Sequence, residues 1–220
     1  MGSRLALWNL TDELLAILGA ESVSAGFRAA GLEVGDELCF TTVRDWYRAG
    51  GESYVYVFDV SDNQQSFRLL LKSLVGSVGG LEYKFKEVLE RRRLLEHRGI
   101  GTPKLYGHHK ATLLEEFVPY TLREALSRPG DDMFRAALDA IRLGTTLDSL
   151  GFAPVSLFPD LRSHGANAVL VDFGSDLGPP HASPGGRLKS YTEAIEFVHS
   201  CNGLTLPELE SWERRKLQVD

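Results

Sequence analysis

Three segments rich in β-branched and aromatic residues constrain the fold of this chain more than any other feature. They cover residues 38–43, 54–60 and 67–71. A polar run at 61–66, Ser-Asp-Asn-Gln-Gln-Ser, separates the second segment from the third, which is typical of a hairpin. The sequence therefore predicts an antiparallel sheet in this part of the chain.

Helical periodicity follows the β-rich part. Apolar residues recur at helical spacing over residues 81–97, and Gly99 stands just beyond the end of this pattern. Further helices are expected at 12–18 after the capping residue Thr11, at 122–126, 133–150 and 188–201, short strands at 112–114, 155–158 and 168–171, and a turn-rich segment at 159–167. Strands followed by helices favour an α+β fold with two lobes.

The composition agrees with this division. The chain has 220 residues, of which 43% are hydrophobic and 25% are charged, so it can bury the core of one or two globular domains. We expect three parts: a helical N-terminal extension over residues 1–36, a β-rich lobe with one helix over 37–118, and a mainly helical lobe with a small hairpin over 119–220.

The net charge of −6 argues against a protein that holds nucleic acid by bulk electrostatics. The basic clusters at 91–93 and 214–216 are predicted to be solvated helix faces. No apolar stretch approaches the ~20 residues of a membrane span, and the two cysteines, Cys39 and Cys201, suit a reducing compartment. We expect a soluble, cytoplasmic protein with no strong signal for nucleic-acid binding and no association with a membrane.

Two short motifs carry chemistry. Asp172-Phe173-Gly174 follows a run of four apolar residues, and Lys72 ends another apolar run far upstream. A lysine on a strand supplies a point charge for nucleotide phosphates, and an aspartate at the end of a strand supplies a ligand for Mg²⁺. These are two of the parts that a phosphoryl-transfer site needs.

A third motif lies between the first two β segments, where Gly50 and Gly51 form a turn ahead of Ser53. Such a turn lets backbone N–H groups approach phosphates, although two glycines are also usual in an ordinary hairpin. The helical pattern at 81–97 places Glu87 fifteen residues after Lys72.

The order of these features resembles the N-lobe of the protein-kinase-like fold, and especially its aminoglycoside-phosphotransferase branch. The similar parts are the strand lysine Lys72, the helix acid Glu87 and the run Thr-Pro-Lys-Leu-Tyr at 102–106. Residues 113–118 look like the family's hinge, 121–126 like the helix after it, and 172–175 like its metal-binding motif. The resemblance covers roughly residues 40–200. It implies a bilobal fold with an antiparallel-sheet N-lobe and a reduced, mainly helical C-lobe, as in small atypical kinases.

The resemblance also implies ATP and Mg²⁺ as cofactors. Lys72 would contact the phosphates and pair with Glu87, or with the competing acid Glu90. Asp172 would hold the Mg²⁺ ion. The remaining nucleotide contacts would come from Gly50, Gly51 and Ser53 at the phosphates and from backbone groups of Glu116 and Val118 at the adenine.

The family's catalytic loop, which carries an aspartate and then an asparagine, has no evident counterpart, because residues 151–158 contain no acid. Two alignments are possible. In the first, 155–158 is the strand after the loop, 159–167 is a hairpin tip, and Ala153-Pro154 replaces the catalytic aspartate. In the second, Asp160 is the catalytic aspartate and Asn167 is a second metal ligand. The second leaves only four residues between Asn167 and Asp172, so it requires a lost strand, and the first is favoured.

The function expected from these features is ATP- and Mg²⁺-dependent transfer of phosphate to a hydroxyl group of a small molecule or a protein. Two alternatives remain open at this point. A pseudokinase would bind a nucleotide or a partner without turnover, and a kinase-fold AMP transferase would transfer the other end of ATP.

Overall fold

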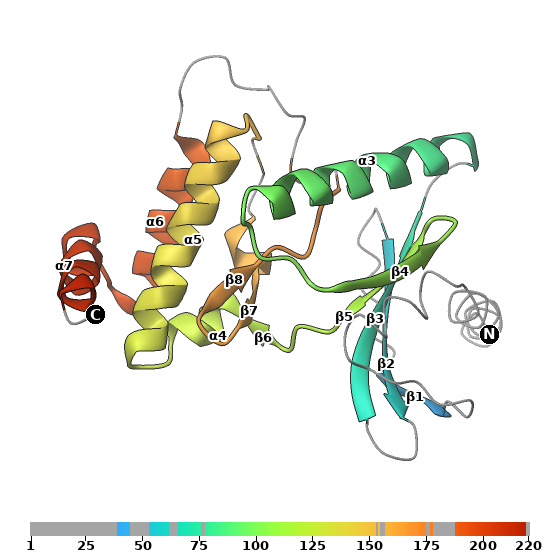
Figure 1. Ribbon diagram of the computed structural model, residues 1–220, viewed down its shortest axis with the longest axis horizontal. Helices are drawn as coiled ribbons and strands as arrows, with labels where there is room; N and C mark the ends of the chain where they lie inside the picture. Colours follow the sequence, from blue (N-terminus) through green and yellow to red (C-terminus); the bar gives the residue numbers. More distant parts are fainter. Residues whose placement is uncertain are drawn as a thin grey trace. The chain divides into compact units, whose positions relative to one another are not determined.

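The computed structural model describes residues 39–44, 53–61, 66–75, 78–152, 154, 157–174, 177 and 188–218. This part of the chain forms an α+β fold in which both sheets are antiparallel (Figure 1). The predicted helix at 12–18, the extension at 1–36 and the turn at Gly50 and Gly51 lie outside the described residues.

Contacts between residues divide the chain into two compact units. The first unit comprises Met1–Glu87 and Pro103–Phe117, and the second comprises Val88–Thr102 and Val118–Asp220. The limit between the two units falls inside the long helix α3 (Val78–His97). The predicted helix at 81–97 is thereby confirmed, and its last turns belong to the second unit.

The first unit is built on a five-stranded sheet. Its described elements are β1 (Cys39–Arg44), β2 (Ser53–Ser61), β3 (Ser66–Leu74), the first turns of α3, β4 (Leu105–His109) and β5 (Thr112–Glu116). The strand order is β1-β2-β3-β5-β4, and every neighbouring pair is antiparallel. The predicted hairpin is confirmed, because β2 and β3 pair continuously from Ser53↔Leu74 to Ser61↔Ser66.

Strand β3 lies in the centre of this sheet, between β2 and β5. Successive side chains of a strand alternate between the two faces, so Leu69 and Leu71 share one face while Lys72 and Leu74 share the other. All four side chains are buried. Helix α3 contributes Phe85, whose ring packs edge-on against His108 of β4 with 5.2 Å between ring centroids.

The second unit combines helices with a small sheet. Besides the end of α3, its described elements are β6 (Tyr120–Thr121), α4 (Leu122–Leu126), α5 (Asp131–Ser149), a 3-10 turn (Phe158–Asp160), β7 (Arg162–His164), β8 (Asn167–Val169), α6 (Lys189–Asn202) and α7 (Leu206–Leu217). The strand order is β6-β7-β8. The predicted helices at 122–126, 133–150 and 188–201 are confirmed as α4, α5 and α6. Thr121 begins α4 with a capping box that it forms with Glu124.

The hairpin before Asp172 differs from the expectation. The predicted strand at 155–158 is wrong at Phe158, which opens a 3-10 turn, and the predicted long turn at 159–167 instead contains β7 and the start of β8. The chain reverses between the paired residues His164 and Asn167, and Gly165 has a φ of 60° there. Glycine adopts this left-handed conformation at little cost, so a two-residue tip suffices.

Helix α7 was not predicted, although the sequence carries its start signal. Thr205 and Glu208 form a capping box, and Pro207 stands in the first turn of the helix. Trp212 anchors the helix, because its ring stacks on Phe134 at 5.4 Å and its Nε1–H donates to Asp131 at 3.0 Å. Among the described helices, none combines the length and the apolar character that crossing a bilayer requires.

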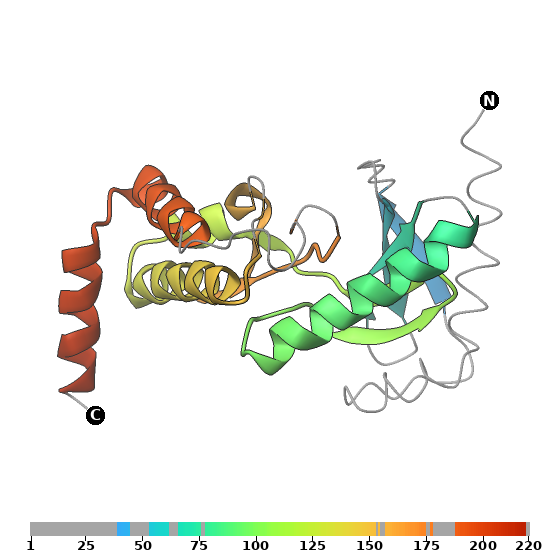
Figure 2. The ribbon, with the colours of Figure 1, turned by 90° about the horizontal axis from the view of Figure 1, so that it is seen from above.

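Helices α5 and α6 run side by side and in close contact (Figure 1 and Figure 2). A Cβ atom at Gly144 of α5 would lie 2.5 Å from the backbone oxygen of Ser190 in α6. One turn on, the Asp148 carboxylate accepts the backbone N–H groups of Ser190 at 2.9 Å and Tyr191 at 2.8 Å. Asp148 therefore caps the first turn of α6 from the neighbouring helix.

The close crossing makes a testable prediction for Gly144→Ala. In an exposed helix this change stabilises by about 1 kcal/mol, but here the new methyl group forces the two helices apart. We expect the free energy of unfolding to fall by about 1–3 kcal/mol, as in other overpacked cores. Urea denaturation of the variant measures it, with Thr145→Ala on an exposed position of the same helix as the control. A Gly144→Ala protein more stable than the wild type would contradict this packing.

Candidate functional site

Asp172 lies at the end of the segment that continues from β8. The segment is held two residues before Asp172, where the backbone N–H of Leu170 donates to the Gly101 carbonyl at 2.9 Å. Asp172 is half-buried, and its Oδ1 accepts the backbone N–H of Gly174 at 3.1 Å. Phe173 between them is fully buried. The motif is therefore a turn of defined geometry that presents one carboxylate.

Two arginines of α3 bind this turn within the second unit. The Nη1 of Arg91 donates to the carbonyl oxygens of Phe173 and Gly174, the two consecutive groups after Asp172. The guanidinium of Arg92 lies over the Phe173 ring, 5.3 Å from its centroid. The prediction of a solvated basic cluster at 91–93 is therefore wrong for Arg91 and Arg92, which are 9% and 2% exposed, and only Arg93 is exposed as expected.

Arg92 also has polar partners that fix its plane. Its Nε donates to Glu96 Oε1 at 2.8 Å, and its Nη2 lies 3.4 Å from the hydroxyl of Thr102. That hydroxyl donates to the same Glu96 oxygen at 2.7 Å. A signal for Arg92 was present in the sequence, because position 92 falls on the apolar face of the helix with Val88 and Leu95.

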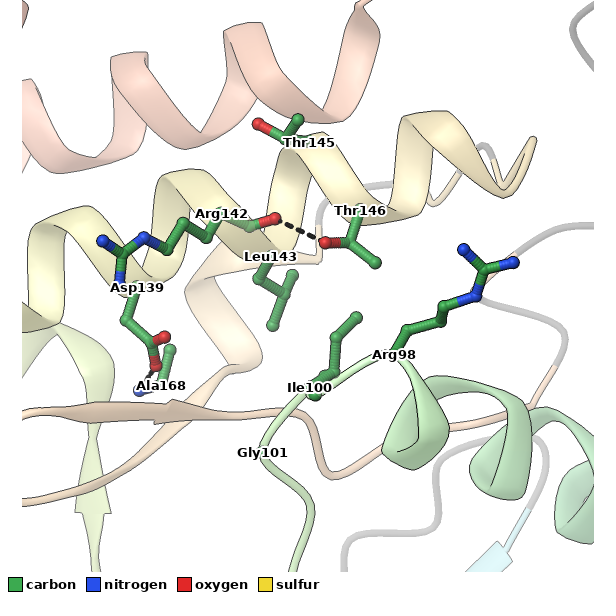
Figure 3. Close-up of a pocket in the computed structure, with 10 residues that line it drawn as sticks. Arg98, Ile100, Gly101, Asp139, Arg142, Leu143, Thr145, Thr146 and Ala168 are labelled. Atoms are coloured by element: carbon green, nitrogen blue, oxygen red, sulfur yellow. Dashed lines mark hydrogen bonds between the residues drawn. The ribbon is translucent and has the colours of Figure 1, made fainter.

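Asp139 of α5 holds the start of the same segment. Its Oδ2 accepts the backbone N–H of Ala168 in β8 at 2.7 Å (Figure 3). Burial raises the pKa of Asp139 above its ordinary value, against smaller lowering effects from the Ala168 N–H and from Arg142. Gly101 also permits a close approach to Ala168, since a Cβ atom there would lie 2.6 Å from the Ala168 oxygen.

A groove of about 420 Å³ lies beside this contact, between α5 and the chain that follows α3. Figure 3 shows Arg98 near one end of the groove, with Asp139 and Arg142 near the other. Arg142 is bound to Glu213 at 2.7 Å. The two arginines do not converge on one point, so the groove does not form a compact anion site.

In the first unit, Lys72 stands opposite Val55 of β2 and Leu113 of β5. Its side chain is 7% exposed. A buried ammonium group is costly unless it faces a compensating charge or a ligand. Glu87 on α3 is half-buried, whereas the competing acid Glu90 is exposed.

The expected nucleotide contacts take the following places. Ser53 is buried at the first position of β2. At the hinge-like segment, the N–H of Glu116 donates to the Lys104 carbonyl at 2.8 Å, and Glu116 Oε2 accepts the Lys104 N–H at 3.1 Å. Val118 is buried. The N–H of Glu116 is therefore already bound within the first unit.

The residues of the second alignment of the catalytic loop take different places in the second unit. Asp160 is an exposed residue of the 3-10 turn, and β7 begins two residues later. Strands β7 and β8 both stand between Asp160 and Asp172, so Asp160 precedes the hairpin as the second alignment expects. Asn167, however, is the first residue of β8 and lines a cavity of about 230 Å³ with residues of α5 and α7, where Asp172 is not among the lining residues.

Of the residues expected to bind a metal ion, Asp172 suits a hard cation such as Mg²⁺. Mg²⁺ takes oxygen ligands and is usually bound by one or two carboxylates together with substrate phosphates. Asp172 offers a carboxylate on a turn that is held from two sides, so this residue fits such an ion.

No protein-family model matches the chain, and no curated protein matches it either.

The half-buried Asp139 makes a pH-dependent prediction. Because its folded-state pKa is raised, ionisation of Asp139 opposes folding, and its contribution to stability falls as pH rises above about 4, the unfolded range of aspartate. Asp139→Asn can still accept the Ala168 N–H and does not ionise. We expect the free energy of unfolding of this variant, relative to the wild type, to increase from pH 4 to pH 7.

Asp139→Ala is the matched variant for the same contact. It leaves the buried Ala168 N–H without its acceptor, so it should destabilise the protein by about 1–3 kcal/mol at pH 4. This loss should shrink toward pH 7, because the variant also lacks the ionisation penalty of the wild type. Urea titrations at several pH values measure both variants. A constant difference between Asp139→Asn and the wild type across this range would show that the half-buried carboxylate carries no such penalty.

Proposed function

We propose that the protein is an ATP- and Mg²⁺-dependent phosphotransferase of small, divergent kinase-like fold. The observation that carries the proposal is the set of contacts that hold the turn at Asp172. Arg91 binds the backbone of this turn, and Arg92 covers the ring of the neighbouring Phe173. A single carboxylate on an immobilised turn is the form in which kinases present a metal ligand. The buried Lys72 on the central strand of the first unit supports it.

The proposed reaction moves the terminal phosphoryl group of ATP to a hydroxyl oxygen. The bond from the γ-phosphorus to the ADP oxygen breaks, a new phosphorus–oxygen bond to the acceptor forms, and ADP leaves. The hydroxyl proton passes to Asp160, the exposed carboxylate ahead of β7. Base catalysis of this kind contributes about 10²–10⁴-fold, and positioning of charge contributes more.

Lys72 and Glu87 serve the phosphates in this proposal. The ammonium of Lys72 binds phosphate oxygens, and Glu87 orients it, since Glu87 is half-buried while Glu90 is exposed. When bound at Asp172, Mg²⁺ supplies charge neutralisation for the phosphates. The acceptor is a small molecule or a protein, because specificity in such a fold resides in loops rather than in the shared motif.

A pseudokinase is the second candidate, and one observation favours it. Asp160 is followed after one residue by β7, so the chain has no room there for the asparagine that the family places between its catalytic aspartate and this strand. A protein of this kind would bind a nucleotide or a partner and would not turn ATP over.

The nucleotide claim is tested by calorimetric titration with ATP and Mg²⁺. Lys72→Ala removes the proposed phosphate contact and should weaken binding by about tenfold or more, the loss typical of a charged hydrogen bond. Lys104→Ala, which removes an exposed lysine of the same unit, serves as the control and should bind like the wild type. Equal affinities of all three proteins for ATP would show that Lys72 does not contribute to nucleotide binding.

Turnover separates the two candidates. With radiolabelled ATP, we expect Asp160→Asn to lose about 10²–10⁴-fold in rate, in line with loss of a general base. Asp172→Asn should lose turnover altogether while remaining folded. A wild-type protein that binds ATP and shows no turnover with any acceptor would favour the pseudokinase, and an acceptor that gains the mass of AMP would indicate adenylyl transfer.

A further inference from the structure

We infer that Arg91 and Arg92 are positioning residues that set the orientation of the Asp172 carboxylate. The inference rests on the proposed function, because it concerns the same carboxylate. It adds two residues of α3 that no motif assigns to the site. Neither arginine is expected to touch a nucleotide or a metal; both act through the backbone and the ring that follow Asp172.

Arg91 acts through Gly174. The Arg91 guanidinium donates to the Gly174 carbonyl oxygen, and the Gly174 N–H in turn donates to Asp172 Oδ1 at 3.1 Å. Gly174 is therefore held at both of its polar backbone groups. The second Arg91 contact, to the Phe173 oxygen at 3.5 Å, keeps the neighbouring peptide plane in register. Loss of Arg91 would free Gly174 to turn and would release the carboxylate from its hydrogen bond.

Arg92 acts through the ring of Phe173. A guanidinium over an aromatic face is an electrostatic contact that strengthens when it is desolvated, and Arg92 is 2% exposed. Glu96 and Thr102 fix the plane of this guanidinium, so the ring meets a surface of set orientation. Packing alone does not require a charge here, because a buried ion pair is often no more stabilising than apolar groups of similar volume.

The two arginines hold the motif from one place on α3. Positions 91 and 92 are adjacent on α3, so a single turn of helix holds both the backbone and the ring of the motif. Both Arg91 contacts come from one nitrogen, Nη1, so a single buried group serves two consecutive carbonyl oxygens. The side chain of Arg93, the next residue along, is exposed and provides a matched control of the same type.

The test compares Arg91→Gln, Arg92→Met and Arg93→Gln in the full chain. Hydrogen–deuterium exchange reports on the segment 168–174 without any ligand. We expect its amides to exchange about tenfold faster in Arg91→Gln and Arg92→Met, the factor that corresponds to one lost hydrogen bond, while Arg93→Gln exchanges like the wild type. The Mg²⁺ concentration for half-maximal turnover should rise about 10-fold to 100-fold in the first two variants, as for other residues that orient a metal ligand.

The outcomes separate this inference from the proposed function. Unchanged exchange in 168–174 in both variants would overturn the positioning role, whatever the activity. Arg92→Met keeps the volume buried, so it decides the question even where Arg91→Gln fails to fold. Faster exchange in the variants, together with a wild-type protein that neither binds nor turns over ATP, would support the positioning role of the arginines and contradict the proposed phosphotransferase function. A loss of kcat with no change in the Mg²⁺ requirement would overturn the link to Asp172.

Discussion

The contact between Arg91 and the backbone after Asp172 is the interaction on which the second unit's candidate site depends. It joins α3 to a short turn that has no regular secondary structure of its own. Such a turn has few internal hydrogen bonds, so its conformation is set by the groups around it. Here those groups are the buried guanidinium of Arg91, which binds its backbone, and that of Arg92, which covers the ring of Phe173.

Other charged residues beside this segment are also removed from solvent, in whole or in part. Arg92 and Asp139 are costly to bury, and each is compensated by a specific partner: a phenyl ring and Glu96 for the first, a backbone N–H for the second. Apolar side chains in these positions would avoid the free-energy cost of desolvating charged groups. They would, however, hold the segment before and after Asp172 less specifically. Burial of polar groups therefore marks the segment whose geometry matters.

Local patterns were sufficient to predict most of the elements but not the groups that hold the site. The hairpin of β2 and β3 and the helices α3 to α6 follow from alternation, helical spacing and caps, which are properties of adjacent residues. Helix α7 carried the same kind of signal at Thr205 and Glu208. The hairpin before Asp172 was misjudged because one glycine, Gly165, allows a two-residue reversal. The contacts of Arg91 and Asp139 depend on tertiary packing, and only the position of Arg92 on an apolar helix face hinted at its burial.

The central claim is that Asp172 is a metal ligand for a bound nucleotide. It is tested most directly by the effect of Mg²⁺ on ATP affinity, measured in the presence of Mg²⁺ and again in the presence of a chelator. The account predicts that the wild-type protein binds ATP more tightly with Mg²⁺, and that Asp172→Asn loses this difference. An Asp172→Asn protein whose ATP affinity rises with Mg²⁺ as much as that of the wild type would contradict it.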